Sequence, residues 1–390
     1  MVKPFQFARI PSIRFKNGVI AGLPGLTGFY GKKLVIVTGK SSFIISNQAE
    51  KLFSDLKKVS ADWRLISIPG EPSPEMIDNA VQLIGGEKVD LVIAIGGGSV
   101  LDAGKAISAM LYKPDSVKEY LEFAGTKEHP GTKVPFIAVP TTSGTGSEVT
   151  KNAVISKIGA DGFKRSLRHD NLVPEIAIID PELTLNCPED ITAASGMDCF
   201  TQLTESYLSV KSNPYTDALA IEGLKAIKSS LVRVCKEGSN IEARAEMSFA
   251  ALTSGICLAN AGLGTVHGFA SSIGARYDVP HGLICGTLMS AANDLNVRNL
   301  RKNQDISALE KYKFLGKLFL DKKEGSDDYL IDGFIEYLYR LSEEIRLPGL
   351  KTAGADESDF ELIIKNTECK NNPVKLSNEE LLEILQKRYF

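Results

Sequence analysis

The 390-residue sequence is poor in cysteine and histidine, has no long apolar run, and carries no strong charge of either sign. Its six cysteines are scattered and form no CxxC pair. This argues against a disulfide framework and against a thiolate zinc site. We therefore expect reduced, mostly buried thiols in a cytoplasmic protein.

The lack of long apolar runs and the balanced charge bear on which kinds of binding partner the protein has. No stretch reaches the roughly 18 uninterrupted apolar residues of a membrane span, and the first six residues do not resemble a signal peptide. The 45 basic and 48 acidic residues give a net charge of -3, without the basic stripe of a nucleic-acid-binding protein. We expect neither a membrane nor a nucleic-acid partner.

The first 180 residues alternate strand-like and helix-like segments. Apolar residues recur at helical spacing over 75–84. Apolar, often β-branched runs that predict strands occupy 33–38, 62–68, 90–95, 136–139 and 176–179. Strands separated by helices are typical of βαβ units and of a mostly parallel sheet.

The composition and the apolar pattern of the sequence change near Asp180 and Pro181. Beyond this point β-branched runs disappear, and segments such as 217–231 and 243–260 are rich in helix-forming residues. A chain of 390 residues exceeds the usual size of one hydrophobic core. We therefore predict two domains, an α/β domain over 1–180 and an all-helical domain over 181–390.

A glycine-rich turn, Gly-Gly-Gly-Ser at 96–99, directly follows the predicted strand 90–95, and a helix-like run begins at Val100. Glycines between a strand and a helix let backbone N–H groups approach a pyrophosphate. A tight turn without a ligand would have the same pattern. The spacing also departs from GxGxxG, because Leu101 occupies the last position.

A second polar loop follows the predicted strand 136–139. Residues 141–146 contain four hydroxyl groups and two glycines, as an ordinary Ser/Thr-rich loop also could. Two such loops at the carboxyl ends of parallel strands are what a ligand crevice in an α/β sheet requires. Together they favour a nucleotide site.

The sequence contains only four histidines, and two of them, His267 and His281, stand beside glycines. Imidazole suits zinc or iron. Asp198 and Gln202 have the i,i+4 spacing of one helix face and could complete a site, although all four side chains could equally have structural roles. The histidines in polar loop contexts, which we expect to be exposed, are His129 and His169.

Several blocks together resemble the iron-containing alcohol dehydrogenases, in order and spacing over nearly the whole chain. They are GGGSVLDAGK (96–105), PTTSGTGSEV (140–149), GMD (196–198), His267 and PHG (280–282). The resemblance implies an N-terminal dinucleotide-binding α/β domain and an all-helical C-terminal domain, the dehydroquinate synthase-like fold, with a metal between them.

The resemblance also implies roles for individual residues. Asp198, His267 and His281 would be catalytic and would bind Fe2+ or Zn2+, with Gln202 where most iron-containing members have a histidine. The positions expected to contact NADP(H) or NAD(H) are Gly39, Lys40, Ser41, Gly97, Gly98, Ser99, Asp102, Thr141, Thr142, Thr145, Ser147, Lys164 and Leu183.

The implied reaction transfers a hydride between NAD(P)H and a small aldehyde or ketone, in a homodimer or larger assembly. At three positions this chain departs from the usual residues of the family, which affects the expected metal affinity, proton transfer and cofactor preference. The amide of Gln202 is a weaker ligand than imidazole, and Ser271 replaces a histidine suited to proton transfer. Gly39 stands where NAD-selective members often have Asp, so we expect NADP(H) to be accepted.

Other activities remain compatible with the same fold. Relatives such as the dehydroquinate synthases and the glycerol-1-phosphate dehydrogenases act on phosphorylated substrates, but the basic cluster they need is missing near the ligand candidates, apart from Arg276. Gln202 also leaves open a metal-independent reductase resembling maleylacetate reductase. A non-catalytic nucleotide-binding protein is the third alternative.

Overall fold

Six strands of the first half form one fully parallel sheet. The computed structural model describes residues 4–322 and 324–390, and the sheet has the strand order β1-β8-β5-β4-β2-β3. Its strands are β1 (Ser12–Phe15), β2 (Lys33–Thr38), β3 (Asp62–Ser67), β4 (Leu91–Gly96), β5 (Phe136–Pro140) and β8 (Ile176–Ile179). β4 lies inside the sheet and is buried along its whole length, as its unbroken apolar run predicts.

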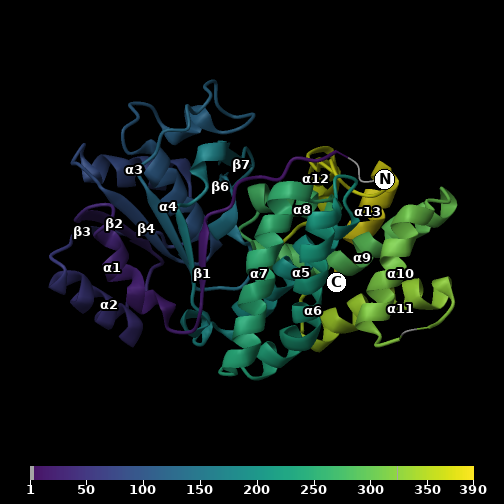
Figure 1. Ribbon diagram of the computed structural model, residues 1–390. Coiled ribbons are helices and arrows are strands. Elements are labelled where there is room, and N and C mark those ends of the chain that lie inside the picture. The colour runs from purple at the N-terminus through teal and green to yellow at the C-terminus, as the bar shows by residue number, and fades with distance from the viewer. Residues whose placement is uncertain (1–3, 323) are drawn as a thin grey trace.

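Helices cover both faces of this sheet (Figure 1). Alternate residues of the strands pack against α3 and α4 on one face and against α1 and α2 on the other. The bounds of these helices are α1 (Leu23–Thr27), α2 (Asn47–Lys58), α3 (Pro74–Ile84) and α4 (Gly98–Met110). The expected α/β architecture is therefore confirmed.

An antiparallel hairpin lies beside the sheet and was not predicted from the sequence. It consists of β6 (Asn152–Lys157) and β7 (Phe163–Arg168). β6 contacts α4 on one side, and β7 contacts a helix of the second half, α8 (Thr265–Arg276). The hairpin thus bridges the two halves of the chain next to the glycine-rich turn.

The second half of the described chain consists of helices around one large apolar core (Figure 1). Besides α8, they are α5 (Glu189–Leu208), α6 (Pro214–Lys236), α7 (Ile241–Ala261), α9 (His281–Lys302), α10 (Ile306–Phe319), α11 (Asp327–Glu344), α12 (Phe360–Lys365) and α13 (Asn378–Lys387). α5 lies at the centre of the bundle and contacts α6, α7 and α9. Among the described helices none alone is long and apolar enough to span a membrane, and only α7 and α8 together, bent by 98°, pass that test.

The expectation that His129 and His169 are exposed is wrong. His129 is buried, and its Nε2 atom lies 3.2 Å from the carbonyl oxygen of Ala109 at the end of α4. Its Nδ1 atom accepts a hydrogen bond from the N–H of Gly131. His169 is half-buried beside it, with the two rings 6.5 Å apart. The polar sequence neighbours of the two histidines suggested that their side chains are exposed. Packing of His129 against the end of α4 buries it instead.

Candidate active site

Three polar side chains of α5 form the base of the candidate site. Asp198, Gln202 and Glu205 are spaced by four and three residues, so they lie on one face of the helix. α5 begins at Glu189, which places Asp198 in the middle of the helix rather than at its start. All three side chains are buried. Buried polar groups of this kind need partners.

Two further helices bring the histidines to this face. His267 lies in the first turn of α8, and His281 is the first residue of α9. The start of α9 fits closely against α5, because a Cβ atom at Gly282 would lie 2.2 Å from the carbonyl oxygen of Ala194. Only glycine permits this approach, which sets His281 beside Asp198.

The ligand-type atoms converge. The Oδ1 atom of Asp198 lies 3.2 Å from Nε2 of His267 and 3.7 Å from Nε2 of His281. A fourth group, the thiol of Cys285, lies 3.7 Å from Nε2 of His267 and 3.8 Å from Nε2 of His281. One ligand atom from each of the four residues lies within 4.8 Å of the others.

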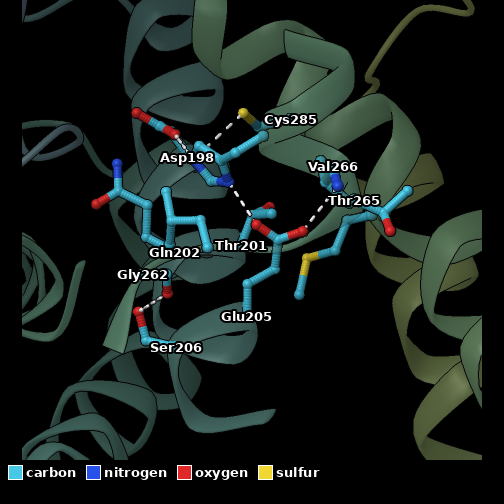
Figure 2. Close-up of polar contacts among 12 residues, drawn as sticks. Asp198, Thr201, Gln202, Glu205, Ser206, Gly262, Thr265, Val266 and Cys285 are labelled. Atoms are coloured by element: carbon cyan, nitrogen blue, oxygen red, sulfur yellow. Dashed lines mark hydrogen bonds and ion pairs between the residues drawn. The ribbon is translucent and has the colours of Figure 1, made fainter. Parts of the chain in front are cut away.

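Glu205 determines the orientation of the His267 ring. Its Oε2 atom lies 2.7 Å from Nδ1 of His267, and its Oε1 atom accepts a hydrogen bond from the N–H of Val266 at 2.7 Å. Figure 2 shows both contacts as dashed lines from the Glu205 carboxylate. When Nδ1 donates its proton to Glu205, Nε2 presents its lone pair to the cluster. Such a carboxylate behind a histidine is the usual support of a metal ligand.

The electrostatics of the cluster fit a cation. Burial alone would raise the pKa of Asp198, but His281 and His267 outweigh burial and lower this pKa to about 2. Burial also opposes a charge on His267, yet Cys285, Asp198 and Glu205 together raise the pKa of this imidazole. Burial raises the pKa of the Cys285 thiol to about 12 and lowers the pKa of His281 to about 4, so the Asp198 carboxylate is the group that draws positive charge to this position. A divalent cation would supply such charge, and two imidazoles with a carboxylate are donors that suit zinc or iron.

Gln202 belongs to the same buried group but is engaged elsewhere. Its Oε1 atom lies 3.2 Å from the Oγ atom of Ser254 on α7. With the oxygen in this position, the NH2 group is the part of the amide that faces Asp198, and it contributes to the lowered pKa of that carboxyl. In this arrangement Gln202 acts as a hydrogen-bond donor to Asp198.

The glycine-rich turn forms the opposite wall of the site. α4 begins at Gly98, two residues earlier than expected, with Gly97 as its N-cap. A Cβ atom at Gly98 would lie 2.6 Å from Cγ2 of Thr145, and one at Gly97 would lie 3.3 Å from Oγ1 of Thr142. The two predicted loops therefore touch, and the free N–H groups at the start of α4 form an anion-binding end.

Two adjoining cavities join the loops to the buried cluster. A cavity of about 310 Å³ is lined by Asp102, Ser147, Lys164, Gln202 and His267, among others. A second cavity, of about 400 Å³, is lined by Gly97, Thr142 and Asp198. Both share the lining residues Gly98, Ser99, Thr145 and His281. The glycine turn and the cluster thus face two adjoining cavities with a shared wall.

The other predicted cofactor positions fall into two groups. Asp102 accepts a hydrogen bond from Ser147 at 2.5 Å, and Lys164 forms an ion pair with Glu71 at 2.9 Å, both at the cavity wall. The predicted positions outside the lining of the two cavities are Gly39, Lys40, Ser41, Thr141 and Leu183. Gly39 nevertheless lies near the start of α4, because its added Cβ atom would be 3.8 Å from Val100.

Comparison with known proteins identifies the family. The profile described as iron-containing alcohol dehydrogenase matches residues 11–181, and that described as the Fe-containing alcohol dehydrogenase family, C-terminal, matches residues 192–389. A 1,3-propanediol dehydrogenase of Citrobacter freundii is 32% identical, over 92% of each chain. The chain belongs to the iron-containing alcohol dehydrogenase family.

Two further relatives of this family agree in sequence and fold. An NADPH-dependent butanol dehydrogenase of Clostridium saccharobutylicum is 29% identical, over 94% of each chain. The structure of an alcohol dehydrogenase from Oenococcus oeni superposes with a TM-score of 0.88 at 32% identity, covering 99% of this chain and all of the other. The protein is accordingly an NAD(P)-dependent oxidoreductase of alcohols and carbonyl compounds, in a family that uses iron or another divalent metal.

Three residues at the site were not singled out from the sequence. Glu205 stands seven residues after Asp198, which is two helical turns along the same face. Cys285 stands four residues after His281 on α9. Glu71, which precedes α3, joins Lys164 to the hydroxyl of Ser99. The first two have a helical spacing that could have revealed them, whereas Glu71 has no such signal.

Proposed function

We propose that the protein reduces small aldehydes with NAD(P)H and oxidises the corresponding alcohols, with Asp198, His267 and His281 holding Fe2+ or Zn2+. The main support for this proposal is that these three side chains and the glycine turn at the start of α4 line two adjoining cavities, which share His281 and Gly98. A reducible carbonyl there could meet both the nicotinamide and the buried cluster. A cation bound at the cluster acts as a Lewis acid on the carbonyl oxygen.

The residues of the chain would position the cofactor and the substrate and form the walls around them. The N–H groups at the start of α4 would hold the cofactor's pyrophosphate, and Thr142 and Thr145 would line its path toward the cluster. Leu258 and Leu263 give the smaller cavity an apolar wall suited to a short carbon chain. Ser271 also lines it and does not titrate near neutral pH, so the alcohol proton must pass through water or a ribose hydroxyl.

Metal content and turnover, measured on one preparation, test this proposal. Protein purified without chelator should contain about one iron or zinc per chain and oxidise NAD(P)H with short aldehydes. Chelation should abolish this activity, and the same ion should restore it, because the ligands remain in place. Full activity without metal would instead support a metal-independent reductase, and no turnover after metal is added would support a non-catalytic protein.

We further propose that NADP(H) is accepted, because Gly39, Lys40 and Ser41 follow β2 without a carboxylate that would repel a 2′-phosphate. The change Gly39→Asp should lower kcat/KM for NADPH by about tenfold and leave kcat/KM for NADH unchanged. The reason is that each pair of like unit charges in contact costs about 1 kcal/mol even in water, and the 2′-phosphate carries more than one negative charge. Gly39→Ala is the matched control, because the added Cβ atom meets nothing closer than 3.8 Å. Equal efficiency of the wild type with both cofactors would refute a strong preference for NADPH.

The protein is also proposed to be cytoplasmic and to form a homodimer or larger assembly. All six cysteines are free, which suits a reducing compartment. β1 lies at an edge of the sheet, and Phe15 on it is 40% exposed. Sedimentation of the purified chain at a single monomer mass would contradict the proposed assembly.

A further inference from the structure

We infer that the thiol of Cys285 is the fourth protein ligand of the metal site, in the role that Gln202 was expected to fill. This inference rests on the proposed function, since it requires a metal at Asp198, His267 and His281. It assigns a ligand that lies on α9, one helical turn after His281.

Four of the six ligand–ligand distances are close to those of tetrahedral coordination, from which a catalytic cation would expand to five ligands to bind the carbonyl oxygen. With metal–nitrogen bonds of about 2.0 Å and a metal–sulfur bond of about 2.3 Å, nitrogen and sulfur ligands on a tetrahedron lie about 3.5 Å apart. The Sγ atom of Cys285 lies 3.7 Å from Nε2 of His267 and 3.8 Å from Nε2 of His281. The corresponding distances from Oδ1 of Asp198, 3.2 and 3.7 Å, bracket the oxygen–nitrogen edge of about 3.4 Å.

The surroundings of Cys285 set it apart from another buried thiol. Its side chain is completely buried, and its polar contacts are the two Nε2 atoms that face the cluster. In contrast, the thiol of Cys257 on α7 contacts the backbone carbonyl of Thr216 at 3.5 Å. Figure 2 shows the Cys285 sulfur directed toward the same group of side chains as Asp198.

Gln202 is less suited to this position. Its oxygen lies 3.2 Å from Oγ of Ser254, so coordination through oxygen would require the amide to turn over. The amide nitrogen that faces Asp198 is not a metal ligand. Gln202 therefore orients Asp198 while Cys285 completes the ligand set.

Coordination by Cys285 is chemically balanced. When the thiol coordinates, its S–H bond breaks, the proton leaves to solvent and a metal–sulfur bond forms. The thiolate and the Asp198 carboxylate would then both bind the cation directly, and the Glu205 carboxylate would lie behind His267 as a further anion. Thiolate coordination also favours softer ions such as zinc over magnesium.

Cobalt substitution provides a direct test. Metal-free protein loaded with one Co2+ per chain should show a sulfur-to-cobalt charge-transfer band in the near ultraviolet. The change Cys285→Ser should remove this band and weaken metal affinity by about tenfold or more, because even the loss of a supporting group behind a ligand costs 10- to 100-fold. Cys257→Ser is the matched control and should keep both the band and the affinity. Gln202→Leu should also keep the band.

The outcomes separate this inference from the function on which it rests. If Co2+ does not bind to the wild type at all, the proposed metal site is wrong. If Co2+ binds with the d–d spectrum of a nitrogen and oxygen site and without the charge-transfer band, the metal site stands and the Cys285 assignment is overturned. Loss of metal in Gln202→Leu but not in Cys285→Ser would also overturn it and would make Gln202 the ligand.

Discussion

Replacing Asp198 with alanine is expected to remove the metal and to lower kcat/KM by about 1000-fold or more. Its Oδ1 atom lies 3.2 and 3.7 Å from the two histidine Nε2 atoms, so its loss leaves the candidate ligands without a hard anionic partner. Lewis-acid stabilisation is worth several kcal/mol, and each increment of about 1.4 kcal/mol changes a rate tenfold. Elemental analysis and steady-state kinetics of the purified variant measure both effects.

Glu205→Gln provides a graded control for this experiment. It keeps every proposed ligand and removes only the negative charge behind Nδ1 of His267, 2.7 Å away. Metal affinity should fall by about 10- to 100-fold, so excess metal should restore activity to Glu205→Gln but not to Asp198→Ala. Circular dichroism must show that both variants are folded. A folded Asp198→Ala protein with normal metal content and turnover would place the metal site elsewhere.

The sequence predicted the parts of the fold that follow from local patterns. The unbroken apolar run of β4 is a buried parallel strand, and the glycines that follow it begin α4. Among the strands, β1 and both strands of the β6–β7 hairpin were missed, and the helices α1 and α2 were not predicted either. β1 is only four residues long and mostly exposed, and β7 is half-buried, with charged side chains, so neither has the apolar pattern of a buried strand.

Only those site residues that stand in sequence motifs could be predicted. Asp198, His267 and His281 stand in recognisable blocks, and the structure brings them together. The role of Glu205 depends on α5 continuing to Leu208 and on its face meeting α8. The position of Cys285 depends on α9 starting against α5, which follows from a contact between Gly282 and Ala194 that is distant in sequence. Such packing between helices has no local signature.

The second large effect is expected at the glycine turn, where Gly98→Ala should weaken NADPH binding by about 10- to 100-fold. The added Cβ atom would lie 2.6 Å from Cγ2 and 2.8 Å from Oγ1 of Thr145, so one of the two loops must shift. A shifted loop would misplace N–H groups that hold the pyrophosphate, and the loss of one hydrogen bond to a charged group costs about 1.5–3 kcal/mol, where every 1.4 kcal/mol or so changes affinity tenfold. Titration of the protein with NADPH, followed by fluorescence or calorimetry, measures the loss.

Gly98→Ala and Asp198→Ala should fail in complementary ways. The glycine turn contributes no ligand-type atom to the buried cluster, so Gly98→Ala should keep its metal while it loses cofactor affinity. Asp198→Ala should lose metal and still bind NADPH, because the start of α4 is unchanged. Gly22→Ala, where an added Cβ atom meets nothing within 4 Å, controls for glycine replacement as such. If Gly98→Ala bound NADPH as tightly as the wild type, the cofactor's phosphates could not lie against the start of α4, and the proposed position of the nicotinamide beside Asp198 would have to be abandoned.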